Sequence, residues 1–516
     1  MCPAKTYRYN GLVKERHEAA PKLSGYVRRI GGGRGWHTMR LNDLLKDIPL
    51  VEAAAGLDLE ITGVSYDSRT TRPGDLFVAM TGFAADGHDY IGRAVEAGAA
   101  CVLCQRRPEA AVPYVLAEDS RRALAVLSAN WFGHPAEEMK IIGVTGTNGK
   151  TTTTYLLKDI LEQEAGATVG LIGTNQNMIG REVLPTERTT PESFEVQKLF
   201  RQMADGGCTH VVMEVSSHAL ALDRVRGVSF AVGIFTNLTQ DHLDFHKTME
   251  AYCDAKAILF QNCGVGVYNR DDPWAERLMK GAACRPFSYG EHGAADLRAE
   301  NTELSADHIA FDAVTNLERV RVKVGIPGEF MVYNTLGVLA AALELGIPLQ
   351  KSADALGRSA HVKGRVEVVP TPGKDYTILI DYAHSPDALE NVLTAVKGFA
   401  KGRVVAVFGC GGDRDKTKRP KMGSIAARLA DFSVVTSDNP RTEAPGDIIA
   451  DILPGMAGAE GRYTVVENRV EAIRWAMEHA ERDDVIVLCG KGHETYQEIN
   501  HVKHHLDERE VVASFL

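Results

Sequence analysis

The segment KIIGVTGTNGKTTTTYLLKDILEQEAG, residues 140–166, constrains the fold of this chain more than any other. An apolar run leads into a turn that contains Gly146 and Gly149, and an amphipathic helical pattern begins at Lys150. A buried strand, a glycine turn and a helix in this order are typical of a phosphate-binding loop, because the free backbone N–H groups and the helix N-terminus attract phosphate oxygens. The segment therefore predicts a nucleotide site in an α/β domain.

The side chains that follow this turn suit the same chemistry. Lys150 would reach the β- and γ-phosphates, and the Thr151 hydroxyl would hold magnesium. The strict pattern GxxxxGK[ST] needs glycine at residue 144, where this chain has Val144, so the general match is imperfect. The alternative is a chance glycine turn followed by a lysine, but the flanking strand and helix disfavour it.

From Met39 onward, short apolar runs alternate with helical stretches, which is the pattern of α/β layers. The last four runs each end in a polar loop, as in a doubly wound parallel sheet whose site lies at the carboxyl ends of the strands. Besides the run before the phosphate loop, we expect strands within residues 74–80, 99–104, 114–117, 209–217, 230–238, 264–270, 376–383, 403–410, 432–438 and 484–490.

These patterns predict an α/β protein of three domains: a small N-terminal α/β domain, a central P-loop ATPase-like α/β domain and a C-terminal Rossmann-like doubly wound domain. We expect the boundaries at residues 39–135, 136–363 and 364–516. Residues 1–38 would form a flexible, basic N-terminal extension. A second hypothesis is that Met39 is the native start, because RRIGGGRG just upstream is what a purine-rich ribosome-binding site would encode.

Composition narrows the class of protein. A hydrophobic fraction of 44% and a charged fraction of 24% are those of a soluble globular protein, and no apolar run approaches the roughly 20 residues that span a bilayer. The formal charge of -10 argues against a nucleic-acid partner, although a local basic cleft could hold phosphates. We therefore expect a cytoplasmic protein without a membrane span, and a monomer.

The nine cysteines are scattered along the chain. Cys101 and Cys104 have the spacing of a zinc knuckle, but no matching second pair follows them. Buried thiols in a reducing compartment are the favoured interpretation.

Many short motifs between residues 66 and 497 resemble, in order, those of the Mur ligases, the ATP-dependent peptide ligases of peptidoglycan synthesis. The resemblance implies that ATP phosphorylates the terminal carboxylate of one substrate and that an amine then attacks the acyl phosphate. It also implies that magnesium is the cofactor and that ATP, UDP-N-acetylmuramoyl-L-alanyl-D-glutamate and meso-diaminopimelate are the substrates. The motifs are DSR, TGTNGKTT, TTPE, EVSSHAL, TNLTQDHLDFH, DAKAILF, DYAHSPD, FGCGGDRDKTKRP, DNPRTE and GKGHETYQ.

By this resemblance, the metal ligands are Thr151, Glu214, His242 and a carbamylated Lys256, made by reaction with CO2. The expected catalytic residues are Lys150, Glu214, His242 and Lys256. Taken singly, the alternatives are a helix-capping glutamate, a hydrogen-bonded histidine and a lysine that extends from the surface to solvent. Glu214 and His242 both follow strands of the sheet that carries the phosphate loop, which favours the metal interpretation.

The resemblance also implies the nucleotide contacts. The ATP residues would be Gly146, Thr147, Asn148, Gly149, Lys150, Thr151, Thr152, Asn334, Asp381 and His384. The last two come from the third domain and would reach ATP only if that domain closes over the second.

For the UDP-linked substrate, the resemblance implies Ser68 at the uridine end. The muramoyl-dipeptide contacts would be Thr189, Thr190, Ser216 and Arg224. Hydroxyls and an arginine suit pyrophosphate and carboxylate oxygens, and turn formation is the alternative for Ser68. The chain departs from the family pattern at Leu222, Arg188 and Met331, where relatives carry glutamine or asparagine.

The stretch VVTSDNPRTEAPGD, residues 434–447, indicates the acceptor amino acid. In ligases that add meso-diaminopimelate, the arginine of DNPR would bind the distal carboxylate in a bidentate pair. L-Lysine has no such carboxylate and would leave Arg441 unpaired, so diaminopimelate is favoured. Glu494 suits the distal ammonium. The expected acceptor residues are Arg414, Asp438, Asn439, Pro440, Arg441, Gly490 and Glu494.

Three alternatives stay open. A lysine-adding ligase of the same fold is the nearest, and DNPR disfavours it. Folylpolyglutamate synthetase is a more distant relative, and DSRTTRPGDLFVAM and GKGHE count against it. A catalytically inactive nucleotide-binding scaffold is the third, and the joint presence of Lys150, Glu214, His242 and Lys256 disfavours it.

Overall fold

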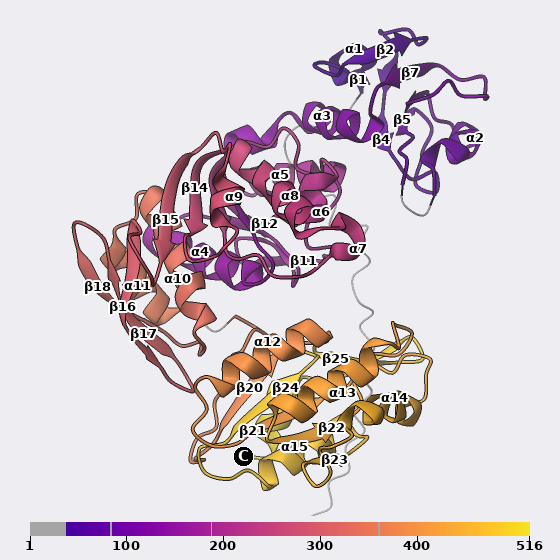
Figure 1. The fold of residues 1–516 in the computed structure, drawn as a ribbon. Coiled ribbons are helices and arrows are strands. Elements are labelled where there is room, and N and C mark those ends of the chain that lie inside the picture. Colours follow the sequence, from indigo (N-terminus) through magenta and orange to yellow (C-terminus); the bar gives the residue numbers. More distant parts are fainter. Residues whose placement is uncertain (1–37, 83–84, 187, 360–361) are drawn as a thin grey trace, which may run out of the picture.

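The computed structural model of the protein describes residues 38–82, 85–186, 188–359 and 362–516. The expectations for the N-terminal extension fall almost wholly outside these residues. Three α/β units follow one another along the chain, each built on its own sheet (Figure 1). The predicted α/β class with three domains is confirmed.

The first unit contains a five-stranded sheet of order β2-β7-β6-β5-β4. Its strands run parallel except the edge strand β2, which is antiparallel to β7. Cys101 and Cys104 are buried in β6, and burial raises the pKa of their thiols to about 12 and about 11, which confirms the expectation of buried thiols. The elements are α1 (Leu41–Leu44), β2 (Leu50–Ala53), β4 (Gly63–Ser65), β5 (Asp75–Val78), α2 (Ile91–Glu96), β6 (Cys101–Cys104), β7 (Tyr114–Ala117) and α3 (Ser120–Phe132).

The middle unit contains an eleven-stranded sheet of order β11-β10-β9-β12-β8-β13-β14-β15-β16-β17-β18. The segment from β9 to β16 is parallel, and the strands at both ends are antiparallel. The strands are β8 (Lys140–Thr145), β9 (Val169–Ile172), β10 (Asn177–Ile179), β11 (Glu182–Leu184), β12 (His210–Glu214), β13 (Phe230–Phe235), β14 (Cys263–Asn269), β15 (Arg285–Gly290), β16 (Leu297–Leu304), β17 (Ile309–Val314) and β18 (Arg319–Val324).

Helices cover both faces of the parallel part of this sheet, and each face has its own hydrophobic core. One face packs against α4, α10 and α11, and the other against α5 and α8. This layering fixes the carboxyl ends of β8, β12 and β13 at one edge, where their loops meet. The helices are α4 (Lys150–Glu164), α5 (Ser193–Asp205), α6 (Ser217–Ala221), α7 (Leu243–His246), α8 (Met249–Gln261), α9 (Ala275–Met279), α10 (Phe330–Glu344) and α11 (Leu349–Arg358).

The third unit contains a six-stranded sheet of order β19-β20-β24-β21-β22-β23. The four strands expected in this region are the inner four, and all pair in parallel. The short edge strands β19 and β23 were not expected, and β19 is antiparallel. The elements are β19 (Glu367–Val369), β20 (Thr377–Asp381), α12 (Pro386–Lys397), β21 (Val404–Phe408), α13 (Lys418–Leu429), β22 (Phe432–Val435), α14 (Pro445–Ile452), β23 (Tyr463–Val465), α15 (Arg469–Glu478), β24 (Val485–Cys489), β25 (Tyr496–Ile499), β26 (Val502–His505) and α16 (Glu508–Ser514).

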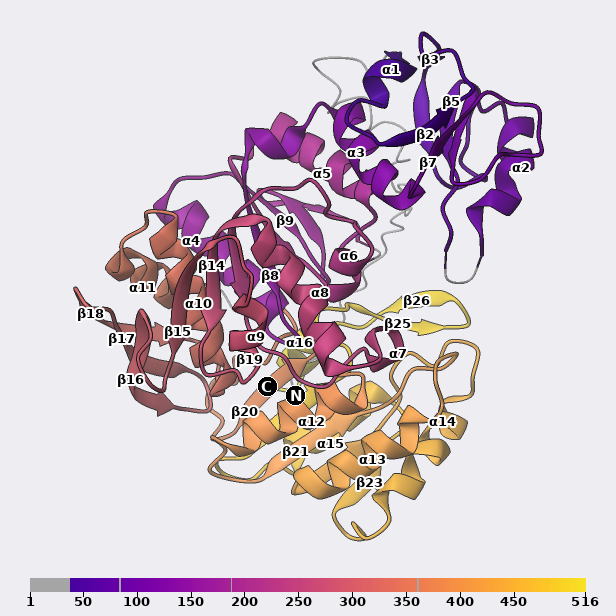
Figure 2. The ribbon, with the colours of Figure 1, turned by 45° about the horizontal axis from the view of Figure 1, so that its top comes forward.

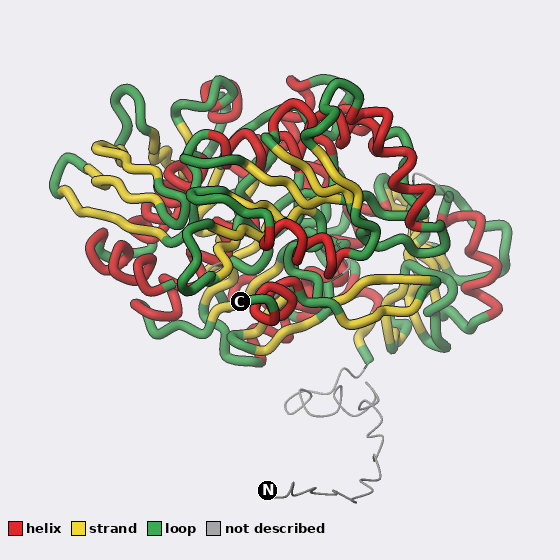
Figure 3. The backbone as a smooth tube through the Cα atoms, turned by 90° about the horizontal axis from the view of Figure 1, so that it is seen from below, coloured by secondary structure: helices red, strands yellow, loops and turns green. Residues whose placement is uncertain are grey.

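The three units are arranged in sequence order, with the middle unit between the other two (Figure 1). Helices α3 and α5 pack at the first junction, and the β25–β26 hairpin lies on the side of the third unit that faces the middle one (Figure 2). Helices, strands and loops are interleaved throughout this arrangement (Figure 3). Among the described residues we find no helix whose length and apolar character would let it cross a bilayer.

Candidate active site

The phosphate loop has the geometry that its sequence predicts: β8 ends at Thr145 and α4 begins at Lys150. Gly149 has a φ of 84°, and a Cβ atom there would lie 2.2 Å from Oδ1 of Asn334. Glycine is therefore required both by the left-handed backbone and by the close approach of α10. The same contact brings Asn334, one of the expected ATP residues, against the loop.

A cavity of about 140 Å³ lies over this loop. Lys150 Nζ donates to the carbonyls of Gly146 at 3.0 Å and Thr147 at 2.8 Å, so its ammonium sits beside the loop backbone. The cavity brings together residues from the loop, from three other segments of the middle unit and from the connector to the third unit. It is lined by Thr147, Asn148, Gly149, Lys150, Thr151, Thr152, Thr174, Thr189, Glu214 and Arg365.

Glu214 ends β12 and faces the start of α4 across this cavity. Its Oε1 accepts from Thr151 Oγ1 and from the Thr174 backbone N–H, both at 2.9 Å, and its Oε2 accepts from Thr174 Oγ1 at 3.0 Å. The carboxylate is buried among oxygen-bearing groups. Hard oxygen ligands are those that Mg²⁺ prefers, so Thr151 and Glu214 fit a magnesium site beside the phosphates.

Lys256 is fully buried on α8, so the alternative that it extends to solvent is wrong. Its Nζ donates to the Gly146 carbonyl at 2.8 Å, the same oxygen that Lys150 approaches. Within the part of the chain that the structure describes, Lys256 forms no ion pair. Burial, and then the charge of Lys150, hold the pKa of the Lys256 amine well below its ordinary value. A buried amine whose pKa is lowered loses its proton more readily, and the unprotonated amine is the nucleophilic form.

His242 lies in the loop after β13 and joins this group through an aromatic side chain. Its ring centroid is 6.0 Å from that of Tyr252, and Lys256 Nζ is 4.5 Å from the Tyr252 centroid. Burial lowers the pKa of His242. No set of three or more His, Cys, Asp or Glu side chains within the described ranges is arranged to hold a metal. A second metal near His242 and Lys256 would thus need a ligand beyond the unmodified side chains.

The residues expected at the muramoyl-dipeptide converge where β12 ends. Thr190 Oγ1 donates to the Glu214 carbonyl at 2.9 Å and accepts from the Ser216 N–H at 3.1 Å. Arg224 Nη1 donates to the Thr190 carbonyl at 3.2 Å, and Thr189 lines the phosphate-loop cavity. The structure therefore brings these four side chains to the edge of the phosphate site.

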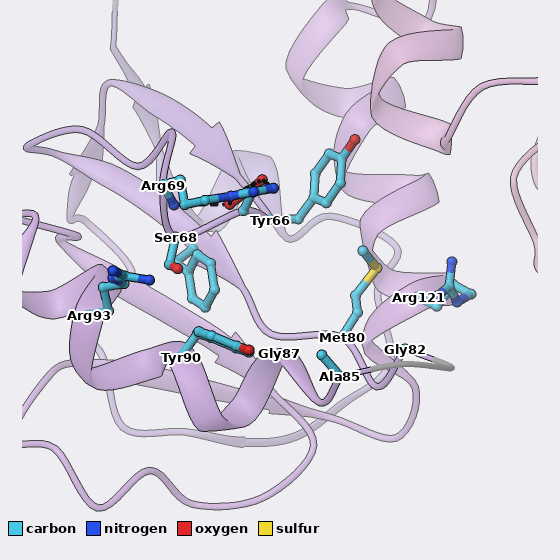
Figure 4. Close-up of a pocket in the computed structure, with 12 residues that line it drawn as sticks. Tyr66, Ser68, Arg69, Met80, Gly82, Ala85, Gly87, Tyr90, Arg93 and Arg121 are labelled. Atoms are coloured by element: carbon cyan, nitrogen blue, oxygen red, sulfur yellow. Dashed lines mark hydrogen bonds and ion pairs between the residues drawn. The ribbon is translucent and has the colours of Figure 1, made fainter. Parts of the chain in front are cut away.

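A second cavity, of about 520 Å³, opens in the first unit, and Ser68 lines it (Figure 4). Aromatic and basic side chains surround it, a combination that suits a base and a pyrophosphate. Arg121 connects it to the peptide side: Arg121 Nη1 lies 3.1 Å from Glu192 Oε2, and Arg224 Nε lies 3.4 Å from Glu192 Oε1. The lining residues are Tyr66, Asp67, Ser68, Arg69, Phe77, Met80, Gly82, Ala85, Gly87, Tyr90, Arg93 and Arg121.

Two expected ATP residues of the third unit lie away from the phosphate loop. The buried Asp381 carboxylate accepts from the backbone N–H groups of Val366 and Ala383, both at 2.9 Å. His384 is exposed, and neither it nor Asp381 lines the phosphate-loop cavity. Arg365 does line it, and sequence reasoning missed this arginine because its connector segment carried no recognised pattern. Asp381 thus holds the backbone that presents Arg365.

The acceptor arginine occupies an unusual backbone position. Arg441 has a φ of 51°, in the left-handed region, and its backbone N–H donates to the Glu498 carbonyl at 3.0 Å. Its Nε pairs with Glu498 Oε2 at 3.0 Å, and its Nη1 donates to the Gly412 carbonyl at 2.8 Å. Arg414 is exposed and lies nearby, since both arginines approach Gly411. The two guanidinium groups thus share one corner of the third unit.

Three of the other residues expected at the acceptor contact a lysine that sequence reasoning did not single out. Lys491 Nζ donates to Asn439 Oδ1 at 2.8 Å and to Glu494 Oε2 at 3.0 Å, and lies 3.5 Å from Asp438 Oδ1. Gly490 has a φ of 116°, and a Cβ there would lie 2.8 Å from Asp438 Oδ2. The loops after β22 and β24 are therefore joined through this lysine.

A third cavity, of about 580 Å³, lies between the middle and third units. It shares Thr174 and Thr189 with the phosphate-loop cavity and reaches Glu494 of the acceptor group. Burial lowers the pKa of His493, which lines it, to about 4. The lining residues are Thr174, Asn175, Thr186, Arg188, Thr189, Tyr382, His493, Glu494, Thr495 and Tyr496.

Three family models match successive parts of the chain. Residues 60–137 match "Mur ligase family, catalytic domain", residues 144–342 match "Mur ligase middle domain", and residues 364–492 match "Mur ligase, glutamate ligase domain".

Characterised relatives match nearly the whole chain. It is 48% identical over 481 residues to UDP-N-acetylmuramoyl-L-alanyl-D-glutamate–2,6-diaminopimelate ligase 1 of Clostridium acetobutylicum, covering 93% of this chain and 99% of the relative. It is also 48% identical over 463 residues to the corresponding ligase of Clostridium botulinum, covering 89% and 95%. A solved structure of a UDP-N-acetylmuramoyl-L-alanyl-D-glutamate–2,6-diaminopimelate ligase matches with a TM-score of 0.69 and 32% identity, covering 93% of this chain and 98% of that one.

Proposed function

The chain belongs to the Mur ligase family, and we propose that it is an ATP-dependent ligase that adds meso-2,6-diaminopimelate to UDP-N-acetylmuramoyl-L-alanyl-D-glutamate in peptidoglycan precursor synthesis. The observation that supports this most is the succession of cavities. A base-and-pyrophosphate cavity with Ser68 is joined through Arg121, Glu192 and Arg224 to the phosphate loop, and the loop cavity shares residues with the cleft that reaches the acceptor group.

The order of the cavities indicates which part of the substrate each cavity binds. The uridine end of the substrate binds in the first cavity at Ser68. Its glutamyl carboxylate then extends past Arg224, Ser216 and Thr190 to Thr189, which lines both the loop cavity and the cleft. The carboxylate therefore arrives where a bound nucleotide presents its γ-phosphate, and where the acceptor enters from the other side.

In the first step, a carboxylate oxygen attacks the γ-phosphorus, and the bond from that phosphorus to ADP breaks. Lys150 neutralises the β- and γ-phosphates, and the loop N–H groups at Gly146, Gly149 and Thr152 hold their oxygens. The N–H groups of Thr147 and Asn148 donate to the backbone and side-chain oxygens of Asn237, so these two residues line the cavity without offering a free N–H. Arg365 adds a second cation to the same cavity. In the second step, the acceptor amine attacks the acyl carbon, orthophosphate leaves and the amine proton is released.

Magnesium held by Thr151 and Glu214 would supply charge neutralisation at the transferring phosphoryl group. We propose that Lys256 carries a carbamate, which turns a buried neutral amine into an anionic ligand and, with His242, completes a second magnesium site. The low pKa of this amine and its position beside Lys150 support that assignment.

The remaining nucleotide contacts require closure of the third unit. Asn334 already touches the phosphate loop at Gly149. Asp381 and His384 would approach the nucleotide only after the third unit rotates toward the middle one, and the cleft between them leaves room for this movement. Closure would also exclude water from the acyl phosphate, which water would otherwise hydrolyse.

At the acceptor end, Arg441 and Arg414 would bind the distal carboxylate of diaminopimelate, with Asp438, Asn439, Pro440 and Gly490 shaping the pocket. Glu494 would take the distal ammonium, because its Oε1 has no partner among the described residues and the residue lines the cleft. L-Lysine as acceptor would leave the arginines without a carboxylate, which is why we favour diaminopimelate.

We further propose that the protein works in the cytoplasm as a monomer, where ATP and the UDP-linked precursor are available. The alternative of an inactive scaffold is disfavoured. It would conserve a nucleotide cavity but would not require Lys256 and Glu214 to be buried beside the phosphate loop, as they are here.

Isotope transfer tests the proposal. UDP-N-acetylmuramoyl-L-alanyl-D-glutamate labelled with ¹⁸O in its terminal carboxylate is mixed with ATP, Mg²⁺ and either diaminopimelate or L-lysine. We expect ¹⁸O in the released orthophosphate and release that depends on diaminopimelate. Unlabelled orthophosphate would exclude the acyl phosphate, and release with lysine alone would overturn the acceptor assignment.

A further inference from the structure

Lys491 is the one buried lysine of the acceptor group, and its position gives it a role in selecting the amino acid. It lies in GKGHE, directly after the strand β24, and its side chain is wholly inaccessible to solvent. Its three polar partners, Asp438, Asn439 and Glu494, are all residues that we expect at the acceptor. Lys491 therefore contacts the residues expected at the acceptor while its own side chain is shielded from solvent.

The contacts divide the Glu494 carboxylate into two halves. Oε2 accepts from Lys491 Nζ at 3.0 Å and from Asn439 Nδ2 at 2.9 Å. Oε1 has no such partner among the described residues, and Glu494 lines the cleft between the units. One oxygen is thus fixed by the protein, and the other is directed to a ligand.

Asp438 makes the same point independently. Its side chain is buried, and Oδ1 accepts no hydrogen bond within the described ranges although Lys491 Nζ lies 3.5 Å away. A buried carboxylate oxygen without a hydrogen bond is costly unless a ligand supplies one. The Lys491 ammonium lies near both carboxylates, 3.5 Å from Asp438 Oδ1 and 3.0 Å from Glu494 Oε2.

Lys491 offsets part of the negative charge of Asp438 and Glu494, the two carboxylates that lie nearest to its ammonium. A zwitterionic distal group, with one ammonium and one carboxylate, brings no net charge to such a site. A side chain ending in an ammonium alone brings a full positive charge. The other charged side chains at this corner are Arg414, Arg441, Glu498, Asp413 and Arg469, and Arg469 is paired with Glu508.

We propose that Lys491 is a specificity-determining residue, whose buried charge offsets the carboxylates of Asp438 and Glu494 in the distal part of the acceptor pocket, so that a zwitterionic end is accepted and a cationic end is disfavoured. The proposal rests on the proposed ligase function. It assigns to Lys491 no contact with the reacting atoms, because the lysine acts through Asp438 and Glu494. Arg441 then binds the distal carboxylate, and Lys491 prevents the two acidic residues from favouring a simple amine.

The test measures kcat/KM with diaminopimelate and with L-lysine for the wild type, Lys491→Met, Glu494→Gln and the double variant. Lys491→Met removes one positive charge from the corner, so we expect the preference for diaminopimelate over lysine to fall at least about tenfold, the effect of about 1.4 kcal/mol. The double variant removes one charge of each sign, so its preference should move back toward the wild-type ratio.

Lys503→Met is the matched control. Lys503 Nζ lies 4.1 Å from the centroid of the Tyr496 ring, and Lys491 Nζ lies 5.5 Å from the same centroid. Lys503 is exposed and forms no ion pair with any carboxylate in the part of the chain that the structure describes. Its loss should therefore leave the ratio of kcat/KM for diaminopimelate to kcat/KM for L-lysine unchanged. Melting temperatures of all variants show whether each protein is folded.

The outcomes separate the two proposals. If the wild type does not use diaminopimelate, the ligase function itself is wrong. If the wild type uses it but Lys491→Met retains the wild-type ratio, the role of Lys491 is wrong. A purely structural role would lower both activities together in Lys491→Met and leave their ratio unchanged, and that result also overturns the inference.

Discussion

Arg441 permits a test that separates backbone strain from substrate recognition. Its φ of 51° places a non-glycine residue in the left-handed region, which costs roughly 1–2 kcal/mol. Arg441→Ala removes the guanidinium and keeps most of this strain, whereas Arg441→Gly removes both. Each variant loses the half-buried ion pair with Glu498, worth about 1 kcal/mol. Arg441→Gly should therefore be more stable than Arg441→Ala by about 1 kcal/mol in urea unfolding.

The effect on the reaction should be the same in both variants. The guanidinium would give the distal carboxylate two charge-assisted hydrogen bonds of roughly 1.5–3 kcal/mol each, of which about 3 kcal/mol remains after desolvation. Loss of that energy lowers kcat/KM for diaminopimelate by about 10². L-Lysine has no distal carboxylate, so its kcat/KM should change little and the selectivity should fall by the same factor.

Orthophosphate release is measured with each amino acid at fixed concentrations of ATP and UDP-linked substrate. It gives kcat/KM for diaminopimelate and for L-lysine, and hence the selectivity of each variant. If both variants kept the wild-type preference for diaminopimelate, Arg441 would not bind the distal carboxylate. If Arg441→Gly were no more stable than Arg441→Ala, the left-handed backbone would not be strained. The two halves of the reasoning can therefore fail separately.

Three further predictions follow from the site. Gly149→Ala would place a Cβ atom 2.2 Å from Asn334 Oδ1 at a φ of 84°, so ATP binding measured by calorimetry should weaken at least about tenfold, and unchanged affinity would contradict the loop geometry. Lys256→Ala should abolish ligation and leave the fold intact by circular dichroism, and ¹³C-bicarbonate should give a carbamate signal in the wild type alone; near-normal turnover would defeat the carbamate assignment. Burial lowers the pKa of His493 from 6.5 to about 4. At pH values between these two, the histidine is protonated in the unfolded chain but not in the folded protein. Wild-type stability should therefore fall as the pH drops through this window, and His493→Gln should reduce that loss by about 1–2 kcal/mol after allowance for solvent screening. An equal loss of unfolding free energy in the wild type and the variant between pH 7 and pH 5, measured by urea unfolding, would refute it.

The inner strands of the third sheet could be predicted because their signal is local, whereas β9 and β15, inner strands of the middle sheet, were not expected. Runs such as residues 404–408 and 485–489 are buried on both faces of a parallel sheet and are therefore continuously apolar. The edge strands β19 and β23 have only three residues each and are half-buried, so they carry too little pattern. In the middle sheet, β16 to β18 form antiparallel pairs beyond the parallel core, and their mixed polar sequence gave no clear prediction.

The candidate site was only partly predictable for a related reason. A motif identifies residues within one loop, as it does for Gly149, Lys150 and Arg441. It does not indicate which residues face each other across loops. Arg365 reaches the phosphate-loop cavity from a connector without a recognised pattern. Lys491 belongs to the motif GKGHE, but the motif does not show which side chains this lysine contacts.

The sequence by itself determined the α/β class, the phosphate loop and the family, because strand burial, glycine turns and helix starts are encoded by neighbouring residues. Only the tertiary structure decided that Lys256 is buried against the same carbonyl as Lys150, and that Lys491 balances the acidic residues of the acceptor corner. Burial and charge balance arise when segments far apart in the chain pack together, and no local pattern carries them.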